Sequence, residues 1–188
     1  MRDIDLPHRA CSGMNPPIRQ ATAPDAASIA AVHIETWQIA YQGLLPGAYL
    51  DSLAAELTTR TEFWRANISS PPVNTEIWVT DRHGHANSFV ALGPARGKDP
   101  FTAGEIYAIY VHPTFWNQGL GRTLFAHATA RLIARGFSAA FLWVLESNAR
   151  ARRFYEIAGW NFDGSTKTET LPGGIELREV CYQKVLHC

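Results

Sequence analysis

Cysteine is scarce in this chain, in which 188 residues include only Cys11, Cys181 and Cys188. Three thiols cannot all pair with one another, and none of them stands in a C-x-x-C spacing. Neither a disulfide framework nor a zinc site is therefore indicated. This use of cysteine is typical of proteins kept in a reducing compartment, and we expect a cytoplasmic location.

An excess of charge of either sign is also lacking, because 17 basic residues balance 17 acidic ones and the formal net charge is +0. Nucleic acids and anionic membrane surfaces select proteins with a basic face, so we expect neither as a partner. No apolar run approaches the roughly 18 residues of a membrane span. The first residues also lack the apolar core of a secretory signal.

Hydrophobic residues make up 46% of the chain and aromatic residues 11%, which is enough for an ordinary globular core. A chain of this length most often folds as one domain, and we assign residues 17–188 to it. Residues 1–16 contain two prolines, a glycine and mixed charges. We expect them to form a disordered or loosely attached tail.

Hydrophobic periodicity and turn residues divide the domain into strands and helices. Strands are expected at 18–22, 75–80, 88–92, 105–112, 139–145, 160–168 and 175–186. Helices are expected to begin at Pro24 and to cover 53–67, 119–135 and 148–159. This order describes a mixed α/β domain built on a central sheet.

Two glycines, Gly119 and Gly121, open the helix that follows the strand at 105–112. Glycine lets a ligand approach the backbone closely. The first amides of a helix, together with the positive end of its dipole, bind anions such as phosphate. A lone G-x-G is weak evidence, however, and taken alone it favours a tight turn in which the glycines serve only packing.

The neighbouring residues strengthen the interpretation as an anion site. Residues 111–113 (Val-His-Pro), 118–122 (Gln-Gly-Leu-Gly-Arg) and Leu124 resemble motif A of the GNAT superfamily, the Gcn5-related N-acetyltransferases. A second set of residues resembles motif B of that family. It consists of Leu142, Val144, Asn148, Ala151, Phe154, Tyr155, Gly159 and Trp160. The resemblance runs from Ile18 to Leu186 in element order and is specific within 105–160. One departure is Trp116, where the family usually has Arg or Gln.

The resemblance implies a mixed α/β fold whose mostly antiparallel central sheet splays between the fourth and fifth strands, with helices on both faces. It also implies acetyl-CoA as co-substrate, with the pyrophosphate on the amides of 118–123 and the pantetheine arm along the strand that ends at Val111. A backbone N–H near Val111 would polarise the thioester carbonyl. The residues implied to contact acetyl-CoA are Ile109, Tyr110, Val111, Gln118, Gly119, Leu120, Gly121, Arg122, Thr123 and Asn148.

Acetyl transfer from a thioester to an amine requires two proton movements, because the ammonium must lose a proton and the leaving thiolate should gain one. Tyr155 matches the family tyrosine that serves as the acid. A phenol, with a reference pKa of about 10, carries its proton at neutral pH. The alternative for Tyr155 is a core aromatic residue paired with Phe154.

Glu105 is the expected base, since many relatives carry a glutamate at this strand position that often acts through water. Strand alternation would place Glu105, Tyr107, Ile109 and Val111 on one face. The alternative is a solvated charge at the start of the strand, and Glu146 is a second candidate base.

The acceptor pocket is expected to form from the first helices and the opening of the sheet, with Trp37, Tyr41, Tyr107 and Trp143 as liners, although each could equally belong to the core. The pair His83-x-His85 lacks a carboxylate or cysteine partner and predicts a polar turn, so no metal is expected. The acceptor is expected to be a small-molecule amine or a peptide amine, and relatives often form homodimers.

Two other functions compete with an N-acetyltransferase that works by direct attack of the amine. One is a catalytically silent GNAT-like module that binds CoA as a sensor, which would need neither Tyr155 nor a base. The other is a nucleotide-binding α/β protein, but the chain lacks the G-x-x-x-x-G-K-[ST] pattern, and the strands before the glycines are expected to be antiparallel and joined by hairpins.

Overall fold

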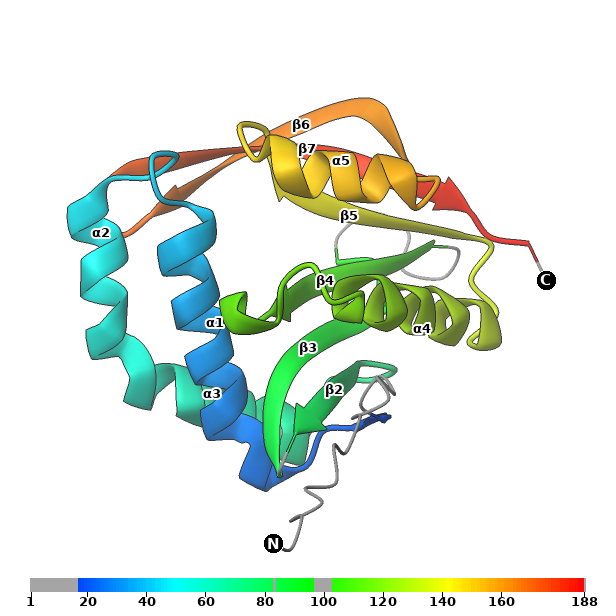
Figure 1. The fold of residues 1–188 in the computed structure, drawn as a ribbon. Helices are drawn as coiled ribbons and strands as arrows, with labels where there is room; N and C mark the ends of the chain where they lie inside the picture. The colour runs from blue at the N-terminus through cyan, green and yellow to red at the C-terminus, as the bar shows by residue number, and fades with distance from the viewer. Residues whose placement is uncertain (1–16, 83, 97–102, 188) are drawn as a thin grey trace, which may run out of the picture.

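The computed structural model describes residues 17–82, 84–96 and 103–187 (Figure 1). The expected tail at 1–16 lies outside these residues, as do His83, the segment 97–102 and Cys188. Within the described residues, every helix is too short or too polar to span a membrane.

The core of the fold is one seven-stranded sheet with the order β1-β2-β3-β4-β5-β7-β6. All neighbours are antiparallel except β4 and β5, which are parallel and joined through α4. The mixed α/β class and the mostly antiparallel sheet are thus confirmed. The strands are Ile18–Gln20 (β1), Glu76–Arg82 (β2), His85–Pro94 (β3), Ala103–Val111 (β4), Ala139–Leu145 (β5), Asn161–Leu171 (β6) and Ile175–Val185 (β7).

Helices flank both faces of the sheet, as expected. They are Ala26–Ala40 (α1), Gly47–Ser52 (α2), Leu57–Ser69 (α3), Leu120–Ala134 (α4) and Ala149–Ile157 (α5), with short 3-10 turns at Ala23–Asp25, Leu53–Glu56 and Pro113–Phe115. The single helix expected at 53–67 is divided, because a 3-10 turn precedes α3. Gly136 and Gly159 follow α4 and α5 with φ of 83° and 77°, which is the left-handed conformation that ends helices.

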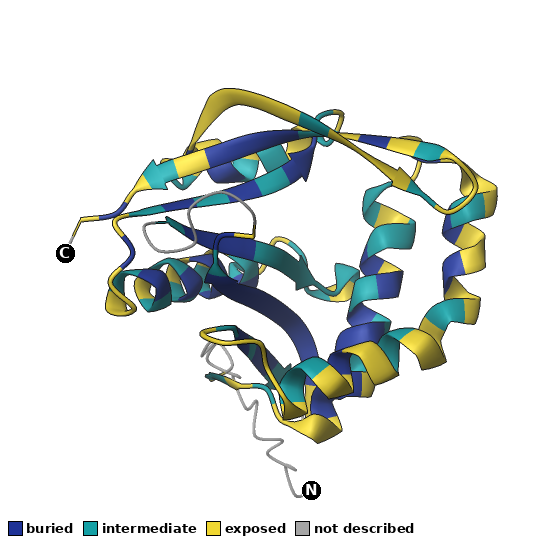
Figure 2. Cartoon of the chain, turned by 180° about the vertical axis from the view of Figure 1, so that it is seen from behind, coloured by how far each residue is buried: buried dark blue, intermediate teal, exposed yellow. Residues whose placement is uncertain are grey.

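Three groups of buried side chains hold these layers together. The largest lies under α4 and α5, and the second joins α1 and α3 to β2, β3 and β4. A third joins α1 and α2 to the β6–β7 hairpin, which reaches across the molecule to α2 (Figure 1). In Figure 2 β3 is buried along most of its length, whereas the edge strand β6 is largely exposed.

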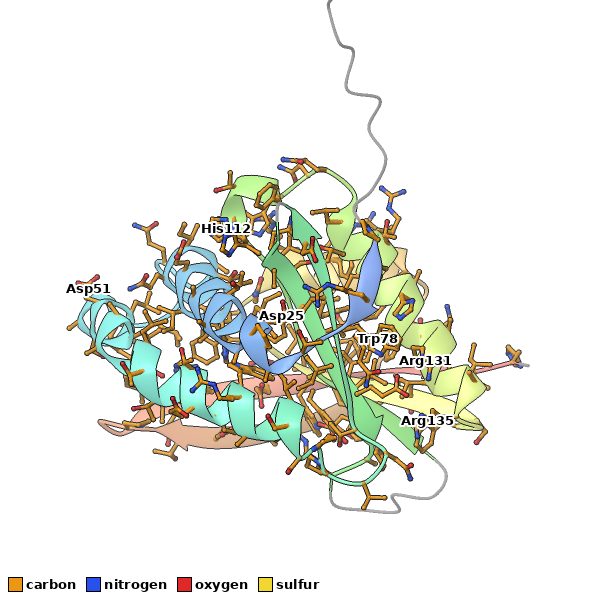
Figure 3. The ribbon with its side chains drawn as sticks, turned by 90° about the horizontal axis from the view of Figure 1, so that it is seen from below. Asp25, Asp51, Trp78, His112, Arg131 and Arg135 are labelled. Atoms are coloured by element: carbon orange, nitrogen blue, oxygen red, sulfur yellow. The ribbon has the colours of Figure 1, made fainter. Side chains whose placement is uncertain are left out.

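A buried carboxylate fixes the far end of α4 to the sheet. Glu76 on β2 accepts hydrogen bonds from Arg131 Nε and Nη2 (both 2.9 Å), Arg135 Nε (2.7 Å) and Trp78 Nε1 (2.7 Å) (Figure 3). The hydrogen bonds from Arg131 are the main cause that lowers the pKa of Glu76 to about 2, against the cost of burial. Because Arg131 lies in the last turn of α4 and Arg135 is its C-cap, this cluster fixes the axis along which the helix N-terminus points.

The sheet splits between β4 and β5. These strands pair only at Ala103–Ala139, Gly104–Ala140 and Glu105–Phe141, and beyond Glu105 no further pairing joins them. Their ends therefore diverge, as the resemblance implied. α4 and α5 lie on one side of the split, and α1 lies near the end of β4 (Figure 1).

A β-bulge in β4 reverses part of the expected alternation. Leu92 pairs with Ile106 but Ala91 pairs with Ala108, so Tyr107 is an extra residue. Ile106 and Ile109 consequently pack under α4, whereas Tyr107 and Tyr110 pack on the side of α1. The prediction that Glu105, Tyr107, Ile109 and Val111 share one face is therefore wrong, because period-two alternation does not survive an inserted residue.

Candidate active site

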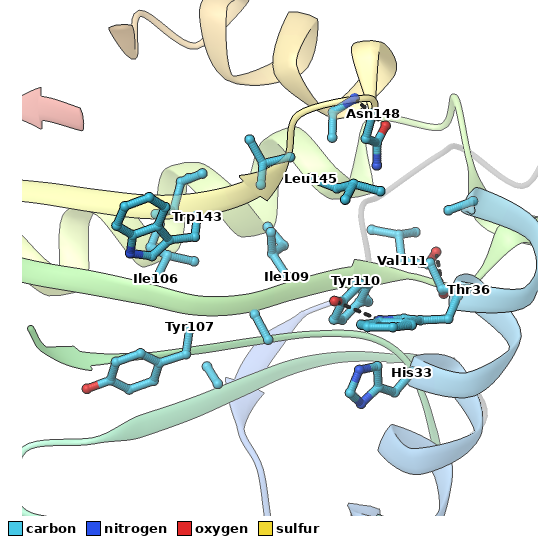
Figure 4. Close-up of a pocket in the computed structure, with 18 of the residues that line it drawn as sticks. His33, Thr36, Ile106, Tyr107, Ile109, Tyr110, Val111, Trp143, Leu145 and Asn148 are labelled. Atoms are coloured by element: carbon cyan, nitrogen blue, oxygen red, sulfur yellow. Dashed lines mark hydrogen bonds between the residues drawn. The ribbon is translucent and has the colours of Figure 1, made fainter. Parts of the chain in front are cut away.

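A cavity of about 1300 Å³ opens where β4 and β5 diverge (Figure 4). Its walls come from α1, α3, β4, β5, α5 and the β6–β7 hairpin, together with the first turn of α4. The predicted site residues that line it are Trp37, Tyr41, Glu105, Tyr107, Ile109, Tyr110, Val111, Gly119, Leu120, Gly121, Arg122, Trp143, Asn148 and Tyr155. Gln118, Thr123 and Glu146 are not among its lining residues.

The turn before α4 makes the helix start abruptly at the cavity. Asn117 and Gly119 adopt positive φ angles of 61° and 83°, and Gly119 is the N-cap of the helix. The first helical hydrogen bond runs from Thr123 N to Gly119 O at 3.1 Å. The amides of residues 120–122 precede that bond and face out of the helix end.

The space above this helix end is open to a ligand. A Cβ at Gly119 would meet nothing within 4 Å, and one at Gly121 would meet only Val111 and Phe154, at 3.7 Å or more. Helix amides and the positive end of the dipole bind phosphate oxygens. This end of the cavity therefore fits the pyrophosphate of a nucleotide-bearing co-substrate. We call the turn at 116–119 and the exposed amides of 120–122 the cradle.

The carbonyl of Val111 ties the end of β4 to two neighbouring elements. It accepts a hydrogen bond from Trp116 Nε1 at 2.7 Å and another from Thr36 Oγ1 of α1 at 3.3 Å. The next residue, His112, lies with Nε2 2.6 Å from Glu35 Oε2, which adds a second tie to α1. The end of β4, the loop that leads from it into α4, and α1 are thus held together where β4 and β5 diverge.

Trp116, the residue that departs from the family motif, lies against a cationic side chain of α5. The guanidinium of Arg150 lies 3.9 Å from the centre of the Trp116 ring, and both residues line the cavity beside Gly119. A cation over an indole face is a favourable arrangement. A positive charge therefore lies at the cradle, although the chain has no Arg or Gln at position 116.

Asn148 lies at the junction of β5 and α5. Its Oδ1 accepts a hydrogen bond from Ala151 N at 3.0 Å, so it is the N-cap of α5. This bond uses the side-chain oxygen. Among the described residues the amide nitrogen, with its two donors, has no hydrogen-bond partner.

Tyr155 belongs both to the core and to the cavity wall. Its ring packs at 5.4 Å from Phe125 and Phe154 and at 6.0 Å from Tyr182, inside the core beneath α5. It also lines the cavity. Burial is the main cause that raises the pKa of the Tyr155 phenol, and Tyr110 adds to it. The phenol therefore carries its proton throughout the neutral range.

Glu105 lies in the cavity wall, and both of its carboxylate oxygens are engaged. Oε2 accepts from Arg96 N at 2.8 Å, and Oε1 accepts from Arg96 Nη2 at 2.6 Å and Nε at 3.2 Å. Glu105 is only 2% exposed, so it is not a solvated charge at the start of a strand. The other candidate, Glu146, pairs with Arg178 at 3.0 Å instead of facing the cavity.

Aromatic rings dominate the other half of the cavity, on the side of α1 (Figure 4). Trp37 Nε1 donates to the Tyr110 hydroxyl at 2.9 Å, and the ring of Tyr41 lies edge-on to Trp37 at 4.8 Å. Tyr107 donates its hydroxyl proton to Pro94 O at 2.6 Å. Of the predicted cofactor contacts, Tyr110 thus directs its side chain into this aromatic half.

Several cavity residues were missed by the sequence analysis, among them His33, Thr36, Arg96, Lys167 and Glu179. The ring of His33 stacks on Tyr110 at 4.8 Å, and burial lowers its pKa to about 3. No motif marked His33 in the sequence. Lys167 and Glu179 lie on the last two strands, where no motif marked them.

Among the described residues no group of three His, Cys, Asp or Glu side chains is arranged to hold a metal ion. His85 starts β3, and its predicted companion His83 lies outside the described residues. The polar groups that the structure describes in the cavity wall are backbone amides, tyrosine phenols and charged side-chain pairs.

A sheet split between two parallel strands, with an anion cradle at the N-terminus of the connecting helix, defines an acetyltransferase fold. The sequence model of the acetyltransferase (GNAT) family matches residues 37–160. The chain therefore belongs to the GNAT family.

Individual relatives agree with this assignment. The uncharacterised N-acetyltransferase YuaI of Bacillus subtilis is 33% identical over 131 residues, which cover 70% of this chain and 72% of that protein. The PaiA N-acetyltransferase of Thermoplasma acidophilum, solved with coenzyme A, is 17% identical over 92% of this chain and 100% of that chain, with a TM-score of 0.68. The yncA structure from Salmonella typhimurium, solved with its cofactor acetyl-CoA, is 19% identical over 93% of this chain and 95% of that chain, with a TM-score of 0.67.

Proposed function

We propose that this protein transfers an acetyl group from acetyl-CoA to the primary amine of a small molecule or peptide, by direct attack of the amine on the thioester. The observation that supports this most strongly is the position of Tyr155. It lines the same cavity as the glycine-bearing N-terminus of α4, at the split between β4 and β5. An anion cradle and a proton donor thus share one cavity.

In this proposal the backbone holds the co-substrate, which supplies the activated acetyl group. The amides of 118–123 bind the pyrophosphate, and Arg150 adds a positive charge beside them. The backbone of residues 109–111 pairs with the pantetheine arm, and Asn148 donates to that arm. A backbone N–H near Val111 polarises the thioester carbonyl.

Tyr155 gives its proton to the departing thiolate. Its raised pKa keeps the phenol protonated at neutral pH, so a proton is available beside the sulfur when the thiolate leaves. No described cysteine lines the cavity, so direct attack needs no acyl-enzyme intermediate. The products are an N-acetylated amine and CoA with its thiol restored.

Glu105 is our proposed acceptor of the amine proton, through a water molecule. The three hydrogen bonds from Arg96 engage both oxygens, so direct abstraction would require one of them to break. If Glu105 acts in this way, Glu105→Gln will remove the acidic limb of the pH–rate profile. An unaltered profile in this variant would exclude Glu105 as the base.

Two measurements test the proposal as a whole. Acetyl-CoA should raise the melting temperature, because a ligand that binds only the folded state stabilises it. A panel of amines should then release CoA thiol in the presence of the enzyme. No thermal shift with millimolar acetyl-CoA would exclude the cofactor, and a shift without thiol release from any amine would favour the silent CoA-binding module. We further propose a cytoplasmic protein, and a homodimer is the assembly to test first.

A further inference from the structure

Lys167 is the one lysine among the described residues that line the cavity. It lies on β6, and its ammonium group is 4.7 Å from the centre of the Trp143 ring and 3.0 Å from Glu179 Oε2. Strand pairing explains the arrangement, because Glu179 on β7 is opposite Lys167 on one side and Leu145 on the other. The aromatic half of the cavity thus contains a primary ammonium bound between an indole face and a carboxylate.

This ammonium is loosely held. The side chain of Lys167 is 39% exposed, and pairs of this kind contribute little to stability. Glu179 Oε2 is shielded from solvent and forms an ion pair with Lys167 at 3.0 Å, but among the described residues it accepts no hydrogen bond. An ammonium that also donates a hydrogen bond to this oxygen could therefore replace the one that Lys167 provides.

The neighbouring cation in the cavity wall is held differently. Arg96 lies 4.4 Å from the centre of the Tyr107 ring, but it also makes three hydrogen bonds to Glu105 at 2.6–3.2 Å. A guanidinium fixed at this many points is not easily displaced. Of the two cation–aromatic–carboxylate groups, the one around Trp143 is the exchangeable one.

Glu179 lines the same cavity as the proposed acid Tyr155, together with Tyr41 and Tyr110. Trp37 joins these two phenols, because it donates to the Tyr110 hydroxyl at 2.9 Å and meets the Tyr41 ring edge-on at 4.8 Å. The carboxylate and the proposed acid therefore open onto one space. A short molecule in that space could contact both.

We propose that the Trp143 ring and the Glu179 carboxylate form a subsite for a second ammonium group of the acceptor, which Lys167 fills until the acceptor displaces it. The proposal rests on the proposed function for the amine that reacts. A carboxylate and an aromatic face favour the charged form of an amine, whereas the amine that attacks must be neutral. This subsite therefore binds the amine that stays charged, and the acceptor class is a short alkyl diamine.

The test is equilibrium binding of putrescine and of butylamine to the full chain in the presence of CoA, which cannot donate an acetyl group. Wild-type protein should bind putrescine more tightly than butylamine. Lys167→Met should tighten putrescine binding by about fivefold by removing the internal competitor, and leave butylamine unchanged. Glu179→Gln should abolish the preference for putrescine. Lys184→Met is the matched control, because Lys184 donates to Ala158 O at 3.1 Å and does not line the cavity.

Equal putrescine affinity in the Lys167→Met and Lys184→Met proteins would overturn the proposal, as would a preference for putrescine that survives Glu179→Gln. Melting temperatures establish that each variant is folded, and Lys167→Gln replaces Lys167→Met if the latter is not. The binding assay requires no turnover. A protein that binds putrescine as expected but releases no thiol would refute the enzymatic function while supporting the subsite.

Discussion

The two halves of the cavity are built in opposite ways. The cradle half consists of groups from one short segment, residues 116, 117 and 119–122, with Asn148 and Arg150 also in its wall. The aromatic half consists of side chains from α1, α3, β4, β5 and the β6–β7 hairpin, which are separated by up to 146 positions in the chain, from His33 to Glu179. A backbone site tolerates side-chain change as long as the turn is kept, whereas a side-chain site can be altered one residue at a time.

The largest effect is expected at Tyr155, where the two halves meet. Tyr155→Phe keeps the ring that packs against Phe125 and Phe154, and removes only the proton donor. Loss of general-acid catalysis should lower kcat by about 100-fold, with the KM for acetyl-CoA little changed. Steady-state kinetics with an active amine measure both constants.

Tyr49→Phe is a matched control, since Tyr49 belongs to the cluster under α2 and does not line the cavity. It should leave kcat unchanged. Equal kcat values for Tyr155→Phe and wild type would exclude Tyr155 as the acid and would leave it with its packing role alone.

The aromatic half should make stability depend on pH through His33. Burial is the main cause that lowers the pKa of His33 from 6.5 to about 3. Above pH 6.5 the ring is neutral in both states and contributes no pH dependence. Below that value only the unfolded chain takes up the proton, so the free energy of unfolding falls as pH falls. At about pH 5 the loss should be about 2 kcal/mol.

His33→Phe should remove this part of the slope while preserving a ring beside Tyr110, which His33 stacks on at 4.8 Å. Urea unfolding at a series of pH values between 6.5 and about 5 measures the slope. The effects of Glu76 and Asp25 fall at lower pH, because their pKa values are lowered from 4.5 and 3.8 to about 2. An unchanged slope in His33→Phe would mean that His33 is protonated in the folded protein.

The same contrast explains what the sequence could predict. The cradle is a local feature, so the order of strand, Gly119, Gly121 and helix indicated the helix start, whereas its interpretation as an anion site needed the family resemblance. The start of α5 after Asn148 and the length of β5 followed from equally local patterns. The family resemblance then supplied the split in the sheet, which no local pattern contains.

The aromatic half could not be predicted to the same depth. Because Tyr107 is an inserted residue, the later side chains of β4 lie on the opposite face of the sheet from the one expected. Nothing in the composition of the strand marks a bulge. Lys167 and Glu179 meet Trp143 only because β6, β7 and β5 are neighbours in the sheet. Long-range pairing of this kind depends on topology. The partner of Glu105 was missed for the same reason, because Arg96 comes from the end of β3.

A pair of glycines at opposite ends of α4 tests the backbone character of the cradle. Gly119 and Gly136 share a φ of 83°, and a Cβ at either would meet nothing within 4 Å. Alanine in this conformation should destabilise the fold by about 1 kcal/mol at either site. Only Gly119→Ala should also weaken CoA binding, by several fold, because the strained turn moves the amides of 120–122. Equal CoA affinity in the two variants would indicate that the amides do not hold the ligand.

The smallest effect is expected at Arg150, the side-chain contribution to the otherwise backbone-built cradle. Arg150→Gln should weaken CoA binding by about threefold, as for one partly exposed charge facing phosphate, and the difference should shrink as salt is raised. Arg153→Gln is the matched control, because Arg153 lies on the same helix but is directed to solvent, 3.8 Å from Glu156. In the Arg150→Gln background, Trp116→Arg should recover affinity by returning the charge to the position that the family usually uses. Failure of that rescue, together with equal CoA affinity in the Arg150→Gln and Arg153→Gln proteins, would mean that backbone amides alone hold the phosphates.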